Sequence, residues 1–86
     1  MAHVAEAHVA EWKANVYLFE EDDVTKARVT LDTRTSQLAG HGTARISAQD
    51  MQVPAIGDEL AAGRALADLG RQLIRTAAED VEGITP

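Results

Sequence analysis

Three segments in which polar and apolar residues alternate precede one long segment in which apolar residues recur at a helical period. The alternating segments are Glu11–Glu20, Val24–Asp32 and Leu38–Ser47, and the helical segment runs from about Pro54 to Glu82. A period of two is typical of strands and a period of 3.6 is typical of helices. The short connections between the alternating segments favour an antiparallel meander with neighbours paired in order. We therefore predict an α+β fold: a three-stranded antiparallel sheet covered on one face by a long C-terminal helix.

The chain has 86 residues, a length that suits one domain. The predicted β-β-β-α domain occupies residues 11–86. Residues 1–10 contain the repeat "AHVAE" twice. We expect this N-terminal extension to be disordered or to form a short helix, as chain ends commonly do.

The helical segment carries a broad apolar stripe that we predict to face the sheet. The large and medium residues of this stripe are Ile56, Leu60, Leu66, Leu73, Ile74, Ala77 and Val81. Its small residues are Gly63, Ala67 and Gly70. Leu69 falls outside the stripe, in a position that the sheet is not expected to cover. On the exposed side, Arg64 and Asp68 have the i,i+4 spacing of an ion pair.

The stretch "LAGHGTARIS" places His41 between two glycines in the third predicted strand. By alternation, Gly40 and Gly42 share the helix-facing side with Leu38 and Ile46. Glycines there would allow strand and helix to approach closely; a β-bulge at either glycine is the competing interpretation. In both cases His41 points away from the helix, as an ordinary exposed or partner-packed residue.

Several classes of function find no support in the sequence. The chain has no cysteine, which excludes disulfides, thiolate metal sites and thiol catalysis. His3 and His8 are five residues apart and cannot face one metal ion from a helix or a strand. No phosphate loop, dinucleotide fingerprint or nucleophile elbow occurs. We expect no catalytic residues, metal, cofactor or small-molecule ligand, and so not an enzyme, in a chain this short with little room for a ligand pocket.

The same features bear on where the protein acts. No apolar run approaches the roughly 20 residues that cross a bilayer, and the N-terminus lacks the pattern of a secretory signal. We expect a cytoplasmic protein without a membrane partner. The formal net charge of −6 argues against attraction of the whole molecule to nucleic acid or to an anionic membrane.

One predicted surface nevertheless combines basic and aromatic residues. The sheet face turned away from the helix collects Lys13, Tyr17, Phe19, Lys26, Arg28, His41 and Arg45. Such a face can bind single-stranded nucleic acid through phosphate contacts and base stacking. The alternative is that these charges are solvated or meet a partner subunit.

Two separated motifs resemble a known family. "GHGTAR" at residues 40–45 and "VPAIGDELAAGRALADL" at residues 53–69 are similar to an actinobacterial family of small proteins, domain of unknown function family 1876. The resemblance implies a fold similar to that of double-stranded-RNA-binding domains, and it brings no established activity. That class of domain holds phosphates with lysines at the start of its last helix. Here the matching positions are Gly57, Asp58 and Glu59. The carboxylates of Asp58 and Glu59 would repel phosphates.

Taken together, these features predict a non-enzymatic interaction or regulatory module that forms a homodimer. One helix covers only one face of a three-stranded sheet, so the other face and two open strand edges invite a partner. The dimer could use the sheet face with Tyr17 and Phe19, a strand edge, or the flank of the helix with Leu69. A nucleic-acid-binding module is the alternative function. An N-terminal segment folded back over the exposed sheet face would instead leave a monomer.

Overall fold

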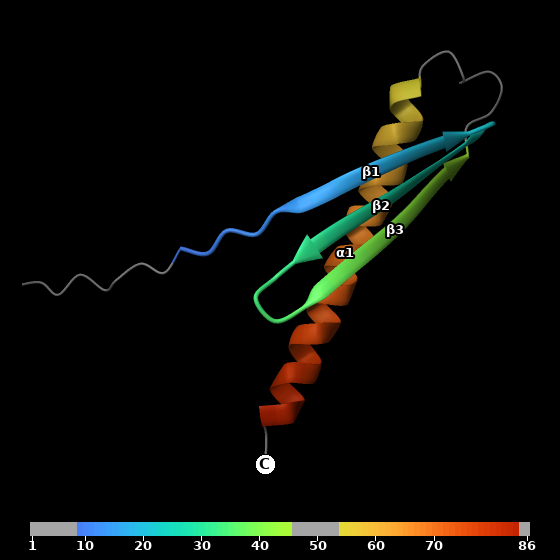
Figure 1. Ribbon diagram of the computed structural model, residues 1–86. Coiled ribbons are helices and arrows are strands. Elements are labelled where there is room, and N and C mark those ends of the chain that lie inside the picture. The colour runs from blue at the N-terminus through green and yellow to red at the C-terminus, as the bar shows by residue number, and fades with distance from the viewer. Residues whose placement is uncertain (1–8, 46–53, 85–86) are drawn as a thin grey trace, which may run out of the picture.

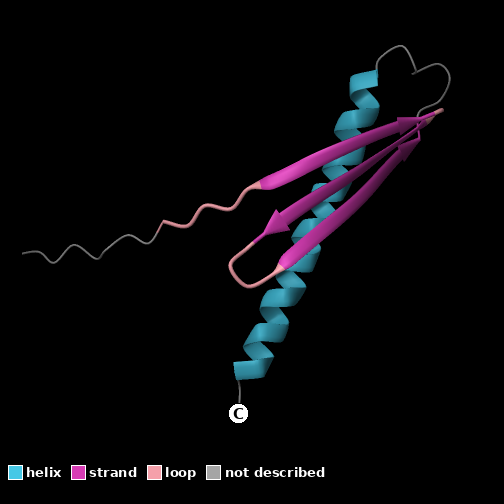
Figure 2. Cartoon of the chain, viewed as in Figure 1, coloured by secondary structure: helices cyan, strands magenta, loops and turns pink. Residues whose placement is uncertain are grey.

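The computed structural model describes residues 9–45 and 54–84 and has the predicted α+β architecture. Its elements are β1 (Ala14–Glu21), β2 (Val24–Asp32), β3 (Gln37–Arg45) and α1 (Pro54–Ile84). The strands form one antiparallel sheet in the order β1-β2-β3, and α1 crosses one face of it (Figures 1 and 2). The C-terminal turns of α1 run past the end of the sheet (Figure 1). The predicted fold class is therefore confirmed.

The two hairpin connections determine where the strands end. Glu21 still pairs with Val24, so only Asp22 and Asp23 form the first turn. Asp22 has a φ of 57°, a left-handed conformation that aspartate tolerates better than most residues. The second connection is closed by Thr33, whose hydroxyl accepts the Ser36 N–H at 2.9 Å. The first strand begins at Ala14 rather than Glu11, and residues 46 and 47 of the predicted third strand lie outside the described residues.

The closest approach in the fold is between β3 and α1, at the two glycines. A Cβ atom at Gly40 would lie 2.8 Å from the Leu69 nitrogen, and one at Gly42 would collide with the Ala61 carbonyl oxygen. The register of β2 and β3 runs without interruption through both glycines. The predicted close approach is thus confirmed, and the alternative of a β-bulge is wrong.

Small residues on α1 make this approach possible. The sheet-facing stripe is Gly57, Ala61, Ala65 and Leu69, all buried and spaced four residues apart. These residues pack against Ala27, Val29, Leu31 and Ala44 of the sheet in one thin core. The position predicted for Leu69 is wrong, because Leu69 is only 5% exposed and belongs to this core.

The stripe predicted to face the sheet is also largely wrong. Five of its large members are exposed: Ile56, Leu60, Leu66, Ile74 and Val81. Leu73 alone packs against the core as a partly buried residue. Gly63 and Gly70 have nothing within 4 Å of a Cβ position, so they do not serve the contact between helix and sheet. Small residues take the sheet-facing positions 61 and 65 because the backbone of β3 lies too close there for larger side chains.

The helix covers the sheet unevenly. Val29 on the central strand is fully buried, whereas its β1 neighbour Val16 remains 44% exposed on the same face. Leu18, the next β1 residue on that face, is 42% exposed. The core therefore lies beneath β2 and β3, and the helix-side face of β1 is left half open.

We predict that Gly42→Ala destabilises the fold by about 3 kcal/mol, at the upper end of the cost of overpacking. The added methyl group would meet backbone atoms of Ala61 and Ala65, which cannot move without shifting the whole helix. Urea unfolding measures the loss. Gly83→Ala is the matched control, because a Cβ at Gly83 has open space and should not lower stability. Equal stability of Gly42→Ala and the unmodified protein would contradict the close contact.

Candidate functional site

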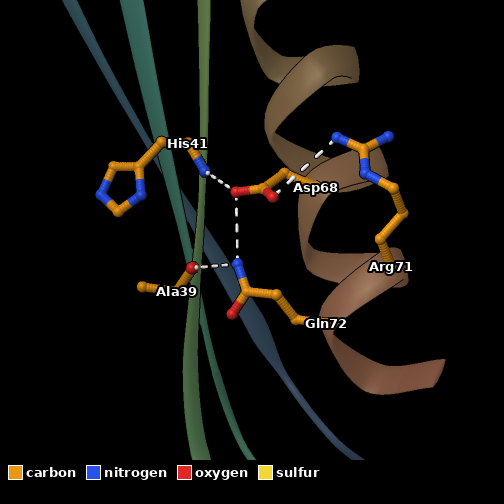
Figure 3. A network of polar contacts seen from close by, with 5 residues as sticks. All are labelled: Ala39, His41, Asp68, Arg71 and Gln72. Carbon is orange, nitrogen blue, oxygen red and sulfur yellow. Dashed lines mark hydrogen bonds and ion pairs between the residues drawn. The ribbon is translucent and has the colours of Figure 1, made fainter. Parts of the chain in front are cut away.

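Three polar side chains of α1 bond to the outer edge of β3; Figure 3 shows two of them, Asp68 and Gln72. Arg64 donates to the Thr43 carbonyl oxygen at 2.7 Å, and Gln72 donates to the Ala39 carbonyl oxygen at 2.8 Å. Between them, the Asp68 carboxylate accepts the His41 N–H at 2.9 Å. Arg64, Asp68 and Gln72 are spaced four residues apart, so they lie on one side of the helix, next to the buried stripe. Helix side chains thus bond to one backbone group on each of three alternate residues of this edge.

Asp68 is the centre of this arrangement. Gln72 donates a second hydrogen bond to the same Asp68 oxygen at 3.2 Å, and Arg71 lies 3.9 Å from the other oxygen. The hydrogen bond from the His41 N–H lowers the pKa of Asp68 below its usual value, and Gln72 and Arg71 act in the same direction. Desolvation of the carboxylate opposes this lowering.

This edge corrects two predictions. Of the two sheet edges expected to be open, that of β3 is covered by α1, and within the described residues only that of β1 is left without a neighbour. The expected Arg64–Asp68 ion pair is replaced by contacts of both side chains with the β3 backbone. In sequence, the signal for this role is the recurrence of hydrogen-bonding side chains every four residues beside the small residues Ala61 and Ala65.

The residues predicted to share the outer sheet face do so. On β2 and β3 they alternate with the more buried positions, and Tyr17 and Phe19 of β1 pair with Arg28 and Lys26. Lys13 precedes β1, and all seven candidates are exposed: Lys13, Tyr17, Phe19, Lys26, Arg28, His41 and Arg45. The imidazole of His41 points away from the helix, and only its backbone N–H contacts Asp68 (Figure 3).

The strand register arranges these residues in rows. Tyr17, Arg28 and His41 occupy directly opposed positions across the three strands. Phe19 and Lys26 are paired in the adjacent row. The outer face therefore presents two aromatic side chains on one strand, each beside a cationic residue of the next strand.

A pair of carboxyl groups lies where β1 passes the start of α1. A hydrogen bond with Asp58, and the negative charge of Asp58, raise the pKa of Glu20. Within the described residues no three acidic or histidine side chains lie close enough to hold a metal ion. His3 and His8, the other histidines weighed as metal ligands, lie outside the described residues.

The strand register shows which β1 residues direct their backbone N–H and C=O groups toward the free edge. His41 directs its N–H away from β2, so Gly40 and Gly42 are the residues that pair with β2. The same alternation, carried across the sheet, leaves the N–H and C=O groups of every second β1 residue turned outward. These residues are Ala14, Val16, Leu18 and Glu20.

An apolar groove lies between the segment before β1, the connection from β2 to β3, and α1. Trp12 and Leu38 on the sheet side and Leu73 and Ala77 of α1 line an open hollow of about 420 Å³. This volume is within the usual range for ligand pockets, so the expectation that the chain has little room for one is wrong.

No helix among the described residues is long and apolar enough to cross a membrane.

The comparisons with known proteins agree with the fold and name no activity. The model of a family described as Rv2632c-like matches residues 10–86. The uncharacterized protein Mb1767 of Mycobacterium bovis is 38% identical over 79 residues, which cover 91% of this chain and 84% of that protein. The uncharacterized protein Rv2632c of Mycobacterium tuberculosis is 41% identical over 71 residues, covering 83% of this chain and 76% of the relative.

A solved structure extends the comparison to three dimensions. The crystal structure of Rv2632c matches with a TM-score of 0.86 at 36% identity, covering 95% of this chain and all of the other. The expected resemblance to actinobacterial proteins of unknown function is confirmed by these mycobacterial relatives.

We predict that Asp68→Asn lowers stability at neutral pH and has little effect in acid. The pKa of Asp68 is lowered in the folded state, so its charge stabilises the fold above the unfolded value of about 4. This contribution is lost as the pH falls through the lower, folded value. Thermal unfolding of both proteins between pH 7 and pH 2 should show the difference shrinking in acid.

Glu79→Gln is the control for this experiment, because it removes one negative charge from an exposed helix position. It should leave the melting temperature at neutral pH nearly unchanged. An equal effect of Asp68→Asn at every pH would contradict a stabilising role of the carboxylate charge.

Proposed function

The chain belongs to the Rv2632c-like family, and we propose that it is a non-enzymatic interaction module that acts as a homodimer in the cytoplasm. The relatives named above are uncharacterized proteins. Support for the proposal therefore comes from the surfaces of the molecule and from the chemistry that its residues can perform.

The observation that carries the proposal is the distribution of apolar side chains. Among the described residues, seven hydrophobic residues are buried and four of these are alanines, whereas eleven large hydrophobic residues are exposed. An apolar side chain of average size releases about 1.5–3 kcal/mol when it moves from water to a buried site. A core this thin contributes little stability, so a protein partner is the natural cover for the remainder.

Two exposed apolar surfaces could be buried in a dimer. The first is the helix-side face of β1, with Trp12, Val16 and Leu18, beside the free edge of that strand. The second is the side of α1 turned away from the sheet, which carries Ile56 and Ile74. In a two-fold dimer each residue acts twice. On the second surface the exposed residues Ile56, Leu60, Ile74 and Val81 give eight side chains in two copies. These contribute on the order of 8 kcal/mol, comparable with the lower part of the roughly 4–15 kcal/mol cost of association.

A second copy of the chain is the preferred partner because a two-fold contact is the commonest solution for a self-complementary surface. Within the described residues no cluster of side chains could hold a metal ion, and Arg34 and Asp80 are the charged residues that line the groove beside Trp12. The absence of cysteine accords with a reducing compartment.

Nucleic-acid binding is the second candidate function, favoured by the rows on the outer sheet face. Tyr17 and Phe19 could stack on bases while Arg28 and Lys26, beside them, contact phosphates. We infer that the family corresponds to family 1876, with its likeness to double-stranded-RNA-binding domains. The route typical of those domains is nevertheless disfavoured, because Glu20 and Asp58 put two carboxyl groups at the helix start.

We predict a particle of two chains in solution. Multi-angle light scattering at low micromolar concentration should give twice the 9.2 kDa mass of one chain, with dissociation on further dilution. The reason is the apolar surface that a monomer leaves in water. A mass of one chain that does not change on concentration would overturn the proposed homodimer and favour the folded-back N-terminus.

For the outer face, we predict weak binding of single-stranded RNA that falls steeply with salt. Arg28→Glu and Lys26→Glu should each weaken it and reduce the slope of log affinity against log salt by about 0.7 per lost phosphate contact. Fluorescence anisotropy with a labelled oligonucleotide measures both. Arg75→Glu makes the same charge change on exposed helix surface and is the control. Unchanged affinity in both sheet variants would exclude this face as the binding site.

A further inference from the structure

The side of α1 turned away from the sheet carries an uninterrupted heptad pattern. Small or apolar residues recur at spacings of four and three over almost the whole helix: Ile56, Leu60, Gly63, Ala67, Gly70, Ile74, Ala77 and Val81. We call these eight residues the outward stripe. An apolar repeat of seven residues, sustained over several heptads, is the pattern by which one helix packs along another.

We propose that α1 packs along α1 of a second copy through the outward stripe, with the two helices parallel and in register. The inference rests on the proposed homodimer and names the surface that forms it. It is distinct from a dimer made through the free edge of β1.

The outward stripe is accessible along its length. Its large residues Ile56, Leu60, Ile74 and Val81 are 45%, 46%, 73% and 62% exposed. Ala67 follows the buried Ala65 by two residues, about 200° around a helix, so the middle of the stripe lies opposite the sheet. Two copies could therefore join helix to helix with their sheets on the outside, without contact between the sheets. Ala77 lies at the side of the stripe nearer the sheet and also lines the groove beside Trp12. The C-terminal turns of α1 extend beyond the strands of the sheet (Figure 1).

The two glycines of the stripe fit such a contact. Glycine is disfavoured inside helices, and neither Gly63 nor Gly70 has any atom within 4 Å of a Cβ position, so no contact within the chain requires them. Together with Ala67 they form three consecutive small positions at the middle of the stripe. Two helices that meet there can approach to the short end of the usual range of about 8–10 Å between axes. The large residues at both ends would then enclose the contact.

The flanking charges select a parallel arrangement. In a parallel pair, Glu59 of one helix lies beside Arg64 of the other, because these residues hold the two flanking positions that meet across the seam. The bond from Arg64 Nη1 to the Thr43 carbonyl oxygen uses one of the five guanidinium N–H groups, so this side chain can serve both contacts. An antiparallel pair with the same apolar layers would place Arg64 opposite Arg71 of the other copy. It would also place Glu59 opposite Asp80, a second pair of like charges. The outward stripe and its flanks are thus complementary to a second copy in one direction only.

Cysteine cross-linking tests the geometry directly, because the chain has no cysteine of its own. In the parallel pair, Ala77 faces its own counterpart, so Ala77→Cys should form a disulfide-linked dimer under mild oxidation. Ala78→Cys is the matched control: the neighbouring exposed alanine lies about 100° away around the helix and should cross-link far less. Equal cross-linking of the two variants would overturn the parallel seam, as would its absence in Ala77→Cys.

A charge placed in the seam provides an independent test. Ala67→Glu should weaken the dimer about tenfold or more, since a carboxylate would be buried without a partner. Ala78→Glu is the control and should leave the dimer intact. Circular dichroism should show unchanged helix content in both variants, because both alanines are exposed in the single chain.

The outcomes separate this inference from the proposed function. A dimer that survives Ala67→Glu but dissociates with Leu18→Lys would place the contact at β1; the homodimer would stand and the helix seam would be wrong. A wild-type protein that stays a single chain at high concentration would overturn both. Dissociation by Ala67→Glu alone, together with selective cross-linking at position 77, is the result we expect.

Discussion

The contact between the two glycines of β3 and the backbone of α1 determines where every other surface of the molecule lies. Because Gly40 and Gly42 have no side chain, the helix lies directly against the third strand, and the alanines Ala61 and Ala65 are fully buried there. The helix is therefore held over one side of the sheet. Its polar flank can then reach the backbone of β3, and β1 on the other side remains half covered.

The polar flank of α1 shows how hydrogen bonding and packing cooperate. A strand edge without a neighbour exposes N–H and C=O groups, and proteins commonly protect such edges. Here Arg64, Asp68 and Gln72 each satisfy one backbone group on three alternate residues of the β3 edge, namely Thr43, His41 and Ala39. These bonds also fix how far the helix can rotate about its axis, and so they fix which residues face outward. The outer apolar side of α1 is a consequence of this fixed rotation.

The order and type of the elements could be predicted because alternation and helical periodicity are properties of the chain alone. The close approach at Gly40 and Gly42 could also be predicted, since two glycines on one side of a strand leave room there for a neighbouring backbone. The orientation of α1 could not. The helix has two apolar sides, and hydrophobicity favours the one with Ile56 and Leu60, whereas the sheet accepts the one with Ala61 and Ala65. Only the depth available above β3, a property of two elements together, decides between them.

Of the candidate surfaces, the outer sheet face could be predicted from the sequence and the covered edge of β3 could not. Residues of the outer sheet face followed from alternation, and Tyr17, Arg28 and His41 share it as predicted. The closing of the β3 edge was missed, because it depends on hydrogen bonds between elements that are 27 residues apart in the case of His41 and Asp68. A spacing of four along a helix indicates a common side but not the strand that this side will meet.

The unequal edges of the sheet limit how far the molecule could assemble by adding strands. A sheet with two open edges can extend without end, one copy after another, and such growth leads to filaments. In this protein the β3 edge is occupied by the chain's own helix, so strand addition is possible at β1 only. Two copies joined there would present an occupied edge at each end. Arg64, Asp68 and Gln72 thus block strand addition at β3, so that a sheet extended through β1 ends after two copies.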